Sequence, residues 1–290
     1  MISPSMTHEA FRARQQSVLL DGLSYKPLRV AWTSVGEGEP VILLHGIPTW
    51  SYLYNDVIPL LAPRYRVIAP DLLGHGYSDR RDFFDRSLVA QTAMILRFMD
   101  HLGLQRAHLV GHDTGGGISL IMAIQHPARV DKLVLTNAVA YDSWPIDDMI
   151  ALGNPHWRSK SPQEVVDFLA AGLPDGLYNR DRLTPEFNTG ILAPYSDEEG
   201  KISIIRNASA LNTSHTTMLA GRHCEIASPA LCLWGVHDPW QPIRDAERLA
   251  ADIPNAKLVR LENASHWSPH DSPVAFASQV EAFLEPSGAR

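Results

Sequence analysis

Six short apolar runs lie along the chain, and segments with helical spacing separate them. The runs cover residues 41–45, 66–69, 107–110, 132–136, 230–234 and 257–261. Apolar residues recur at the spacing of an amphipathic helix in segments 50–61, 88–102, 115–125, 243–252 and 272–284. Continuous apolar strands, each followed by a helix, are typical of a parallel sheet that is covered on both faces. The pattern therefore predicts an α/β fold.

The pattern changes between residues 138 and 227. Proline, glycine and asparagine interrupt this segment repeatedly, and its helical pieces are short. We interpret it as a helical cap inserted into a core domain that is formed by residues 1–137 and 228–290. Because open parallel sheets bind ligands at the carboxyl ends of their strands, we expect the cap to lie over that edge.

The hexapeptide at residues 111–116, Gly-His-Asp-Thr-Gly-Gly, follows one predicted strand and begins the next helix. A nucleophile with a small residue two positions away on each side is the pattern of a nucleophile elbow. The glycines permit a tight turn, since a Cβ at Gly111 or Gly115 would approach neighbouring backbone. Asp113 occupies the nucleophile position. The alternative interpretation makes Asp113 the N-cap of an ordinary helix, a position that aspartate also favours.

Two further polar residues follow predicted strands nearer the C-terminus. Asp238 comes after the run at 230–234, and His266 comes after the run at 257–261. Each has an ordinary explanation, as a turn aspartate before proline or as a solvated loop histidine. However, the order nucleophile, acid, histidine is that of catalytic triads on such sheets, and all three residues come just after strands. We therefore predict a triad of Asp113, Asp238 and His266.

Two backbone N–H groups are candidates for an oxyanion site. Ile47 follows the dipeptide His45-Gly46 at the end of the first apolar run, and Thr114 begins the helix after the elbow. N–H groups at the start of a helix carry partial positive charge and stabilise a developing oxyanion. We expect Ile47 and Thr114 to supply these donors.

Composition narrows the remaining classes of function. The net charge of −7 argues against nucleic acid or an anionic membrane as the main partner. No apolar stretch approaches ~20 residues, so we expect no membrane span. Two cysteines without metal-ligand spacing fit a reducing cytoplasm, and the 13 histidines form no zinc motif. We expect a cytoplasmic monomer or homodimer without metal or cofactor, acting on a small apolar molecule and water.

The motifs resemble those of the α/β-hydrolase superfamily, in the branch of haloalkane dehalogenases and epoxide hydrolases. The resemblance covers nearly the whole chain and includes the loops at residues 45–54 and 71–79. It implies a mostly parallel eight-stranded sheet, with helices on both faces and an inserted helical cap. It also implies a mechanism in which Asp113 forms an alkyl ester at an sp³ carbon. His266, oriented by Asp238, would then activate the water that hydrolyses this ester.

The leaving group divides the two families. Haloalkane dehalogenases typically place a tryptophan after the nucleophile to hold the halide, and one group adds an asparagine after the His-Gly pair. Thr114 and Ile47 stand at these positions here, so a departing halide would lack its usual donors in a dry site. Epoxide hydrolases instead use two cap tyrosines as the acid. The cap offers three tyrosines and a histidine for this role, namely Tyr141, Tyr178, Tyr195 and His215.

These features favour an epoxide hydrolase that yields a vicinal diol. The alternative is a haloalkane dehalogenase that releases halide and alcohol, with a cap residue such as Trp144 or Trp157 as the halide donor. Ester or lactone hydrolysis and non-catalytic ligand binding are further alternatives. The residues expected to contact the substrate are Trp50, Tyr141, Trp144, His215 and Trp267.

Overall fold

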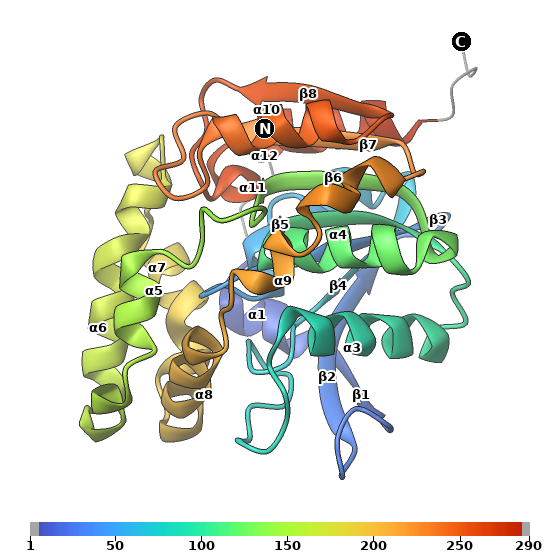
Figure 1. Ribbon diagram of the computed structural model, residues 1–290. Coiled ribbons are helices and arrows are strands. Elements are labelled where there is room, and N and C mark those ends of the chain that lie inside the picture. The colour runs from blue at the N-terminus through green and yellow to red at the C-terminus, as the bar shows by residue number, and fades with distance from the viewer. Residues whose placement is uncertain (1–5, 286–290) are drawn as a thin grey trace.

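A computed structural model describes residues 6–285 and centres on one eight-stranded sheet. The strand order is β1-β2-β4-β3-β5-β6-β7-β8 (Figure 1). The strands are β1 (Gln16–Leu20), β2 (Leu28–Val35), β3 (Glu39–Leu44), β4 (Tyr65–Pro70), β5 (Ala107–Asp113), β6 (Val130–Ala138), β7 (Ala230–Gly235) and β8 (Ala256–Leu261). Strands β3 to β8 are parallel, whereas β2 is antiparallel to β1 and β4. The predicted mostly parallel eight-stranded sheet is confirmed.

Helices follow most of the strands of the core. They are α1 (His8–Ala13), α2 (Ile58–Leu61), α3 (Leu88–His101), α4 (Thr114–Gln125), α10 (Ile243–Asp252), α11 (Ser268–Asp271) and α12 (Pro273–Leu284), with 3₁₀ turns η1 (Ser51–Tyr54) and η2 (Pro127–Arg129). The hydroxyl of Ser87 accepts a hydrogen bond from the N–H of Ala90 and so caps the start of α3. The helix predicted at 50–61 is instead divided into η1 and α2. Pro59 lacks an N–H and suits only the first turn of a helix, so it begins a new one.

Successive side chains of a strand point to opposite faces of the sheet, so the interior is divided into two cores, one on each face. Ile42 and Leu44 of β3 pack with residues of α3, α4 and α10. Val41 and Leu43 belong to the second core, with residues of α2 and α12. All four side chains are fully buried. Burial on both faces explains why these strands are continuous apolar runs in the sequence.

The segment from 138 to 227 is mostly helical. Its elements are α5 (Asp147–Leu152), η3 (Pro155–Ser159), α6 (Pro162–Gly172), η4 (Leu173–Gly176), η5 (Arg180–Arg182), α7 (Pro185–Leu192), η6 (Ala193–Tyr195), α8 (Glu198–Ser209), α9 (Ser214–Thr217) and η7 (Ala220–Glu225). Helices α5 to α8 form a group on one side of the sheet, at the left in Figure 1. We call this group the cap. The exact division into core and cap domains stays a prediction.

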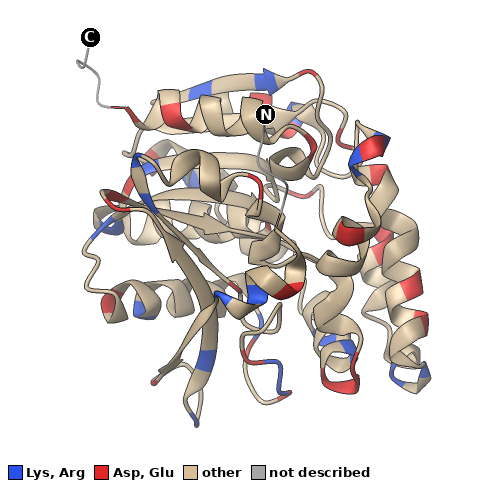
Figure 2. Ribbon diagram, turned by 180° about the vertical axis from the view of Figure 1, so that it is seen from behind, with Lys and Arg blue, Asp and Glu red and all other residues tan. Residues whose placement is uncertain are grey.

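Figure 2 shows Lys, Arg, Asp and Glu mainly along helices, in loops and near the ends of strands. Ion pairs such as Lys160 with Glu164 are exposed and contribute little to stability, typically below ~1 kcal/mol. No described helix has both the length and the apolar composition that crossing a membrane requires.

Candidate active site

Asp113 lies at the turn from β5 to α4, in a backbone conformation that few non-glycine residues adopt. Its φ is 51°, a region where a side chain costs about 1–3 kcal/mol of strain. A Cβ on Gly111 would lie 2.5 Å from the carbonyl oxygen of Gly115, and one on Gly115 would lie 2.3 Å from that of Leu44. The turn therefore requires both glycines. The Asp113 side chain makes no hydrogen bond that caps α4, so it does not act as an ordinary N-cap.

Backbone N–H groups hold the carboxylate of Asp113. The N–H of Ile47 donates to its Oδ1 at 2.9 Å, and the N–H of Thr114 also bonds to it. Gly46 lets the loop after β3 approach, because a Cβ there would lie 2.0 Å from Oδ1. Burial raises the pKa of Asp113 above its ordinary value, although His266 and the two N–H groups oppose the shift. Both predicted oxyanion donors thus meet at this carboxylate.

His266 lies between two carboxylates. Its Nδ1–H donates to Oδ2 of Asp238 at 2.8 Å, and its Nε2 is 4.0 Å from Oδ2 of Asp113. Burial alone would lower the pKa of His266, but the negative charges of Asp238 and Asp113 outweigh burial and raise it. All three side chains are buried. The structure therefore brings the three predicted triad residues together just past β5, β7 and β8.

Asp238 is fixed by three further hydrogen bonds. Its Oδ1 accepts from the N–H groups of Trp240 (2.8 Å) and Gln241 (3.0 Å). Its Oδ2 accepts from Nδ2 of Asn137 at 2.8 Å. Asn137 stands near the end of β6 with φ 42°, and the sequence analysis missed it. Asparagine tolerates positive φ, so an asparagine at the end of an apolar run was the available signal.

His112 supports His266 from the side of the elbow. Its Nε2–H donates to the carbonyl oxygen of His266 at 2.8 Å, and the two ring centroids are 4.7 Å apart. Burial lowers the pKa of His112 well below its ordinary value, so the ring is neutral. The sequence did not predict this role, because the sequence next to a nucleophile does not show in which direction the neighbouring side chain points.

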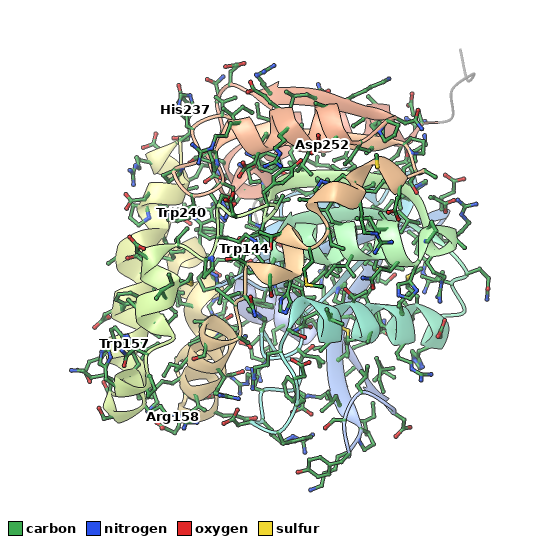
Figure 3. The ribbon with its side chains drawn as sticks, in the orientation of Figure 1. Trp144, Trp157, Arg158, His237, Trp240 and Asp252 are labelled. Carbon is green, nitrogen blue, oxygen red and sulfur yellow. The ribbon has the colours of Figure 1, made fainter. Side chains whose placement is uncertain are left out.

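A cavity of about 60 Å³ opens onto Asp113 and His266. Core and cap both contribute to its mostly apolar wall. The lining residues include Ile47, Thr114, Val139, Trp144, Ile146, Asp148, Met149, Phe168, Leu169, Leu173, Leu211, Trp240, Gln241 and Trp267. Figure 3 shows Trp144 and Trp240 between the core and the cap, whereas Trp157 lies at the far end of the cap. Of the residues expected to contact substrate, Trp144 and Trp267 line this cavity.

The three tryptophans of the cavity differ in what their indole N–H groups do. The N–H of Trp144 donates to Oγ1 of Thr216 at 2.7 Å, and that of Trp267 donates to the carbonyl of Leu173 at 3.1 Å. Trp240 has no such acceptor among residues 6–285, and its ring meets His266 edge to face at 4.9 Å. Trp240 therefore retains a free N–H donor beside the triad.

The other expected substrate contacts lie elsewhere. The indole of Trp50 is fully buried and donates to the carbonyl of Gly190. The hydroxyl of Tyr141 donates to Asp252 of α10, and His215 is half-buried on α9. None of the three lines the cavity. Within the described residues, no tyrosine that could donate a proton lines the cavity. Tyr178 stacks on a surface histidine, and Tyr195 lies in the core.

One group of residues in the described chain has the spacing of a metal site. His8, Glu9 and Glu186 bring their ligand atoms within 4.8 Å of one another. The backbone N–H of His8 donates to Glu186 at 2.7 Å, and the His8 ring lies 2.8 Å from the same oxygen. These bonds join α1 to α7, away from the cavity, so the group serves the docking of the two helices.

Comparisons with known proteins agree with this fold. A family model described as alpha/beta hydrolase fold matches residues 39–273. "Haloalkane dehalogenase 2" of Mycobacterium tuberculosis is 30% identical over 266 residues, which cover 87% of this chain and 90% of the relative. "Cis-3-alkyl-4-alkyloxetan-2-one decarboxylase" of Xanthomonas campestris is 29% identical over 269 residues, with coverage of 86% and 89%.

Solved structures of other proteins have the same fold. An alpha/beta hydrolase fold protein from Burkholderia ambifaria superposes with a TM-score of 0.83 at 26% identity, covering 92% of this chain and 98% of the other. The epoxide hydrolase CorEH superposes with a TM-score of 0.80 at 24% identity, covering 93% and 97%. At that identity the second likeness concerns the fold alone.

Proposed function

Since this chain belongs to the α/β-hydrolase fold family, we propose that it is a hydrolase in which the carboxylate of Asp113 displaces a leaving group from an sp³ carbon. The observation that carries the proposal is the direction of Asp113 into an apolar cavity, 4.0 Å from His266. The N–H groups of Ile47 and Thr114 and the facing His266 favour the ionised form of Asp113, and an ionised carboxylate is itself a nucleophile. It therefore needs no base for the first attack.

In the first step Oδ2 of Asp113 attacks the carbon, and the electron pair of the broken bond leaves with the departing group. Oδ2 is the oxygen that faces His266, whereas the N–H of Ile47 holds Oδ1. The product of this step is an ester between the substrate carbon and Asp113. The apolar wall excludes competing water while the ester forms.

In the second step His266 takes a proton from water, and the hydroxide attacks Cγ of the ester. Negative charge then develops on Oδ1, where the N–H groups of Ile47 and Thr114 stabilise it. Collapse of this intermediate releases an alcohol and regenerates the carboxylate. Asp238 stabilises the imidazolium that forms on His266 during the proton transfer.

We infer that the leaving group departs as a stable anion, with halide as the first candidate. An alkoxide would require an acid, and no tyrosine lines the cavity in the described chain. A halide requires hydrogen-bond donors rather than an acid, and Trp240 lines the cavity with an N–H that has no acceptor within the described chain. The relative of Mycobacterium tuberculosis that bears the name haloalkane dehalogenase supports this choice.

Epoxide hydrolysis is the second candidate, because Thr114 and Ile47 stand where haloalkane dehalogenases place halide donors. A third leaving group that needs no acid is the carboxylate of a strained lactone. The relative named as an oxetan-2-one decarboxylase directs attention to that ring.

The test is turnover of bromoalkanes, terminal epoxides and β-lactones in ¹⁸O water, followed by mass spectrometry of the peptide that contains Asp113. Halide, alcohol and label in Asp113 are the expected results. Diol with label in Asp113 would move the enzyme to epoxide hydrolysis. Product without label in Asp113 after many turnovers would exclude the ester mechanism. His266→Gln should accumulate the ester as a mass increase on the same peptide.

A further inference from the structure

A second, smaller recess lies behind Thr114. Its volume is about 20 Å³, room for roughly one or two water-sized groups at ~10–15 Å³ each. Its polar walls come from His75, Arg86, Gln91, Thr114 and Asn207, and aliphatic side chains complete it. The mechanism proposed above uses none of these side chains.

Arg86 gives the recess its charge. The residue is only 7% exposed, and burial lowers its pKa to about 10, so it remains cationic at neutral pH. Its Nη1 donates to Oγ of Ser203 (2.8 Å) and Oδ1 of Asn207 (2.6 Å), and its Nη2 donates to two backbone carbonyls. One face of the guanidinium lies over the ring of Phe84 at 4.5 Å. All of these partners are neutral.

No carboxylate oxygen within the described chain lies within 4.0 Å of the guanidinium of Arg86. Two acids, Asp79 and Asp82, act on Arg86 from a greater distance. Asp79 pairs with Arg81, and Asp82 pairs with Arg158 and Arg206. The Nε of Arg86 is buried and has no hydrogen-bond partner. Buried charges in proteins are generally paired, so a buried guanidinium without a carboxylate partner beside a recess favours an anionic ligand.

The recess adjoins the reaction cavity. Ile47, Thr114 and Leu211 line both spaces. Thr114 directly follows the nucleophile Asp113 in the chain, so the recess begins close to the reacting carboxylate. A substrate group that binds at Arg86 must therefore enter between these three side chains.

We propose that this recess binds a carboxylate group carried by the substrate, with Arg86 as its counter-ion. The volume accommodates the two oxygens of a carboxylate, and the buried Nε–H of Arg86, which has no partner, can donate a charge-assisted hydrogen bond to one of them. His75 is neutral, because burial lowers its pKa, and leaves Arg86 as the positive charge. The inference rests on the proposed function only in placing the reaction at Asp113.

Asp148 also lines the reaction cavity and would repel an anionic substrate if it were buried. It is exposed in the first turn of α5, where its charge favours the helix terminus. Water and salt screen such a charge strongly. The guanidinium of Arg86 is buried and screened far less. The carboxylate of Asp113 is also buried, but it lines the reaction cavity and not the recess, where Arg86 is the charged wall.

The first measurement is the Tm of the wild-type chain with propionate and with 1-propanol at equal concentration and ionic strength. Ligand that binds only the folded state raises Tm whether or not any reaction follows. We expect a rise with propionate that 1-propanol does not produce. Equal shifts for the two compounds, or none, would overturn the proposal. This measurement also stands if an Arg86 variant fails to fold.

The second measurement compares matched substrates, 3-bromopropionate with 1-bromopropane and 6-bromohexanoate with 1-bromohexane. One charge-assisted hydrogen-bonded pair should favour an acid over its matched alkane by about 10- to 100-fold in kcat/KM. R86Q should remove this preference, measured as the ratio of kcat/KM between each acid and its matched alkane, because any loosening of the cap affects both substrates alike. R86K should restore part of the preference. The matched control is R206Q, which removes an exposed arginine of the same region and should keep the preference.

The outcomes separate the two proposals. One outcome is that no substrate is turned over, while propionate raises the Tm of wild type and R206Q but not that of R86Q. The carboxylate site at Arg86 is then supported, and the proposed function is excluded. If bromoalkanes and bromo acids react equally well in wild type and R86Q, the carboxylate site is excluded while the proposed function stands.

Discussion

Asp113 is buried where its negative charge is unfavourable, and this sets a conflict between stability and chemistry. Its raised pKa means that the folded state binds the proton more tightly than the unfolded state. The stabilising effect is therefore present below the unfolded value of ~4 and lost as pH rises through the folded value. At neutral pH the ionised carboxylate destabilises the fold.

Asp113→Asn should abolish turnover and raise Tm at pH 7. The amide keeps an oxygen for the N–H groups of Ile47 and Thr114 but removes the buried charge. Thermal unfolding measures the change, each ~1 kcal/mol appearing as about 2–4 °C for a chain of this size. The gain should disappear at pH 3, and a lower Tm at pH 7 would contradict this account.

His266 should determine the acid limb of the pH profile. The base must be neutral. In the free enzyme Asp238 and Asp113 both raise the pKa of His266, but once Asp113 is esterified only the charge of Asp238 remains to raise it. Hydrolysis of the ester should therefore fall as the pH drops and His266 is protonated, at a midpoint that Asp238 raises. Asp238→Asn should lower the rate about 10²–10⁴-fold and move the midpoint to lower pH. Single-turnover kinetics across pH 5–9 measures both effects, and an unmoved midpoint would contradict the assigned role of Asp238.

At the scale of elements, the inner strands could be predicted because both their faces are buried. The runs at 107–110, 230–234 and 257–261 became β5, β7 and β8, and the order of the polar residues after them predicted the triad. The edge strand β1 was not predicted, since most of its residues are exposed or partly exposed and the continuous apolar signal is missing. Contacts with substrate depend on how the cap packs against the core. The spacing of residues in the sequence therefore could not predict whether the side chains of Tyr141 and His215 point into the cavity.

The loop after β3 must contain glycine to let Asp113 take its place. In Gly46→Ala the new Cβ would lie 2.0 Å from Oδ1 of Asp113, so the carboxylate or the loop must move. We expect a loss of at least about 100-fold in kcat/KM, since small misplacements at a reacting centre have such effects. Gly221→Ala is the control, because its Cβ would meet nothing within 4 Å. Similar kinetics for the two variants would contradict the geometry of the loop.

At the scale of the molecule, the cap is attached to the core at several separate points. The backbone N–H of His8 in α1 bonds to Glu186 of α7, and Arg86 bonds to two residues of α8. Arg182 of η5 pairs with buried Asp56 and donates to the carbonyl of His270 at 2.9 Å. These attachments fix the cap over the cavity.

Arg182→Gln should lower both stability and catalytic efficiency. Removing one partner of a buried ion pair leaves Asp56 without its arginine, a change that costs about 3–5 kcal/mol where both groups are buried. Because Arg182 is partly exposed and His270 stays 3.6 Å from Asp56, the loss should fall below that range, with a rise in KM as the cap loosens. Arg180→Gln in the same turn removes only an exposed pair and should leave Tm and KM nearly unchanged. Equal behaviour of the two variants would contradict the role of Arg182.

The strained turn at Asp113 belongs to the backbone and its glycines rather than to the carboxylate. The same turn would present a serine or a cysteine to the same N–H donors and the same histidine. Exchange of one side chain can therefore change the class of reaction while the scaffold is inherited intact. For such a scaffold, ancestry and chemistry separate over evolutionary time, and resemblance between whole chains is a poorer guide to substrate than the few groups around the elbow.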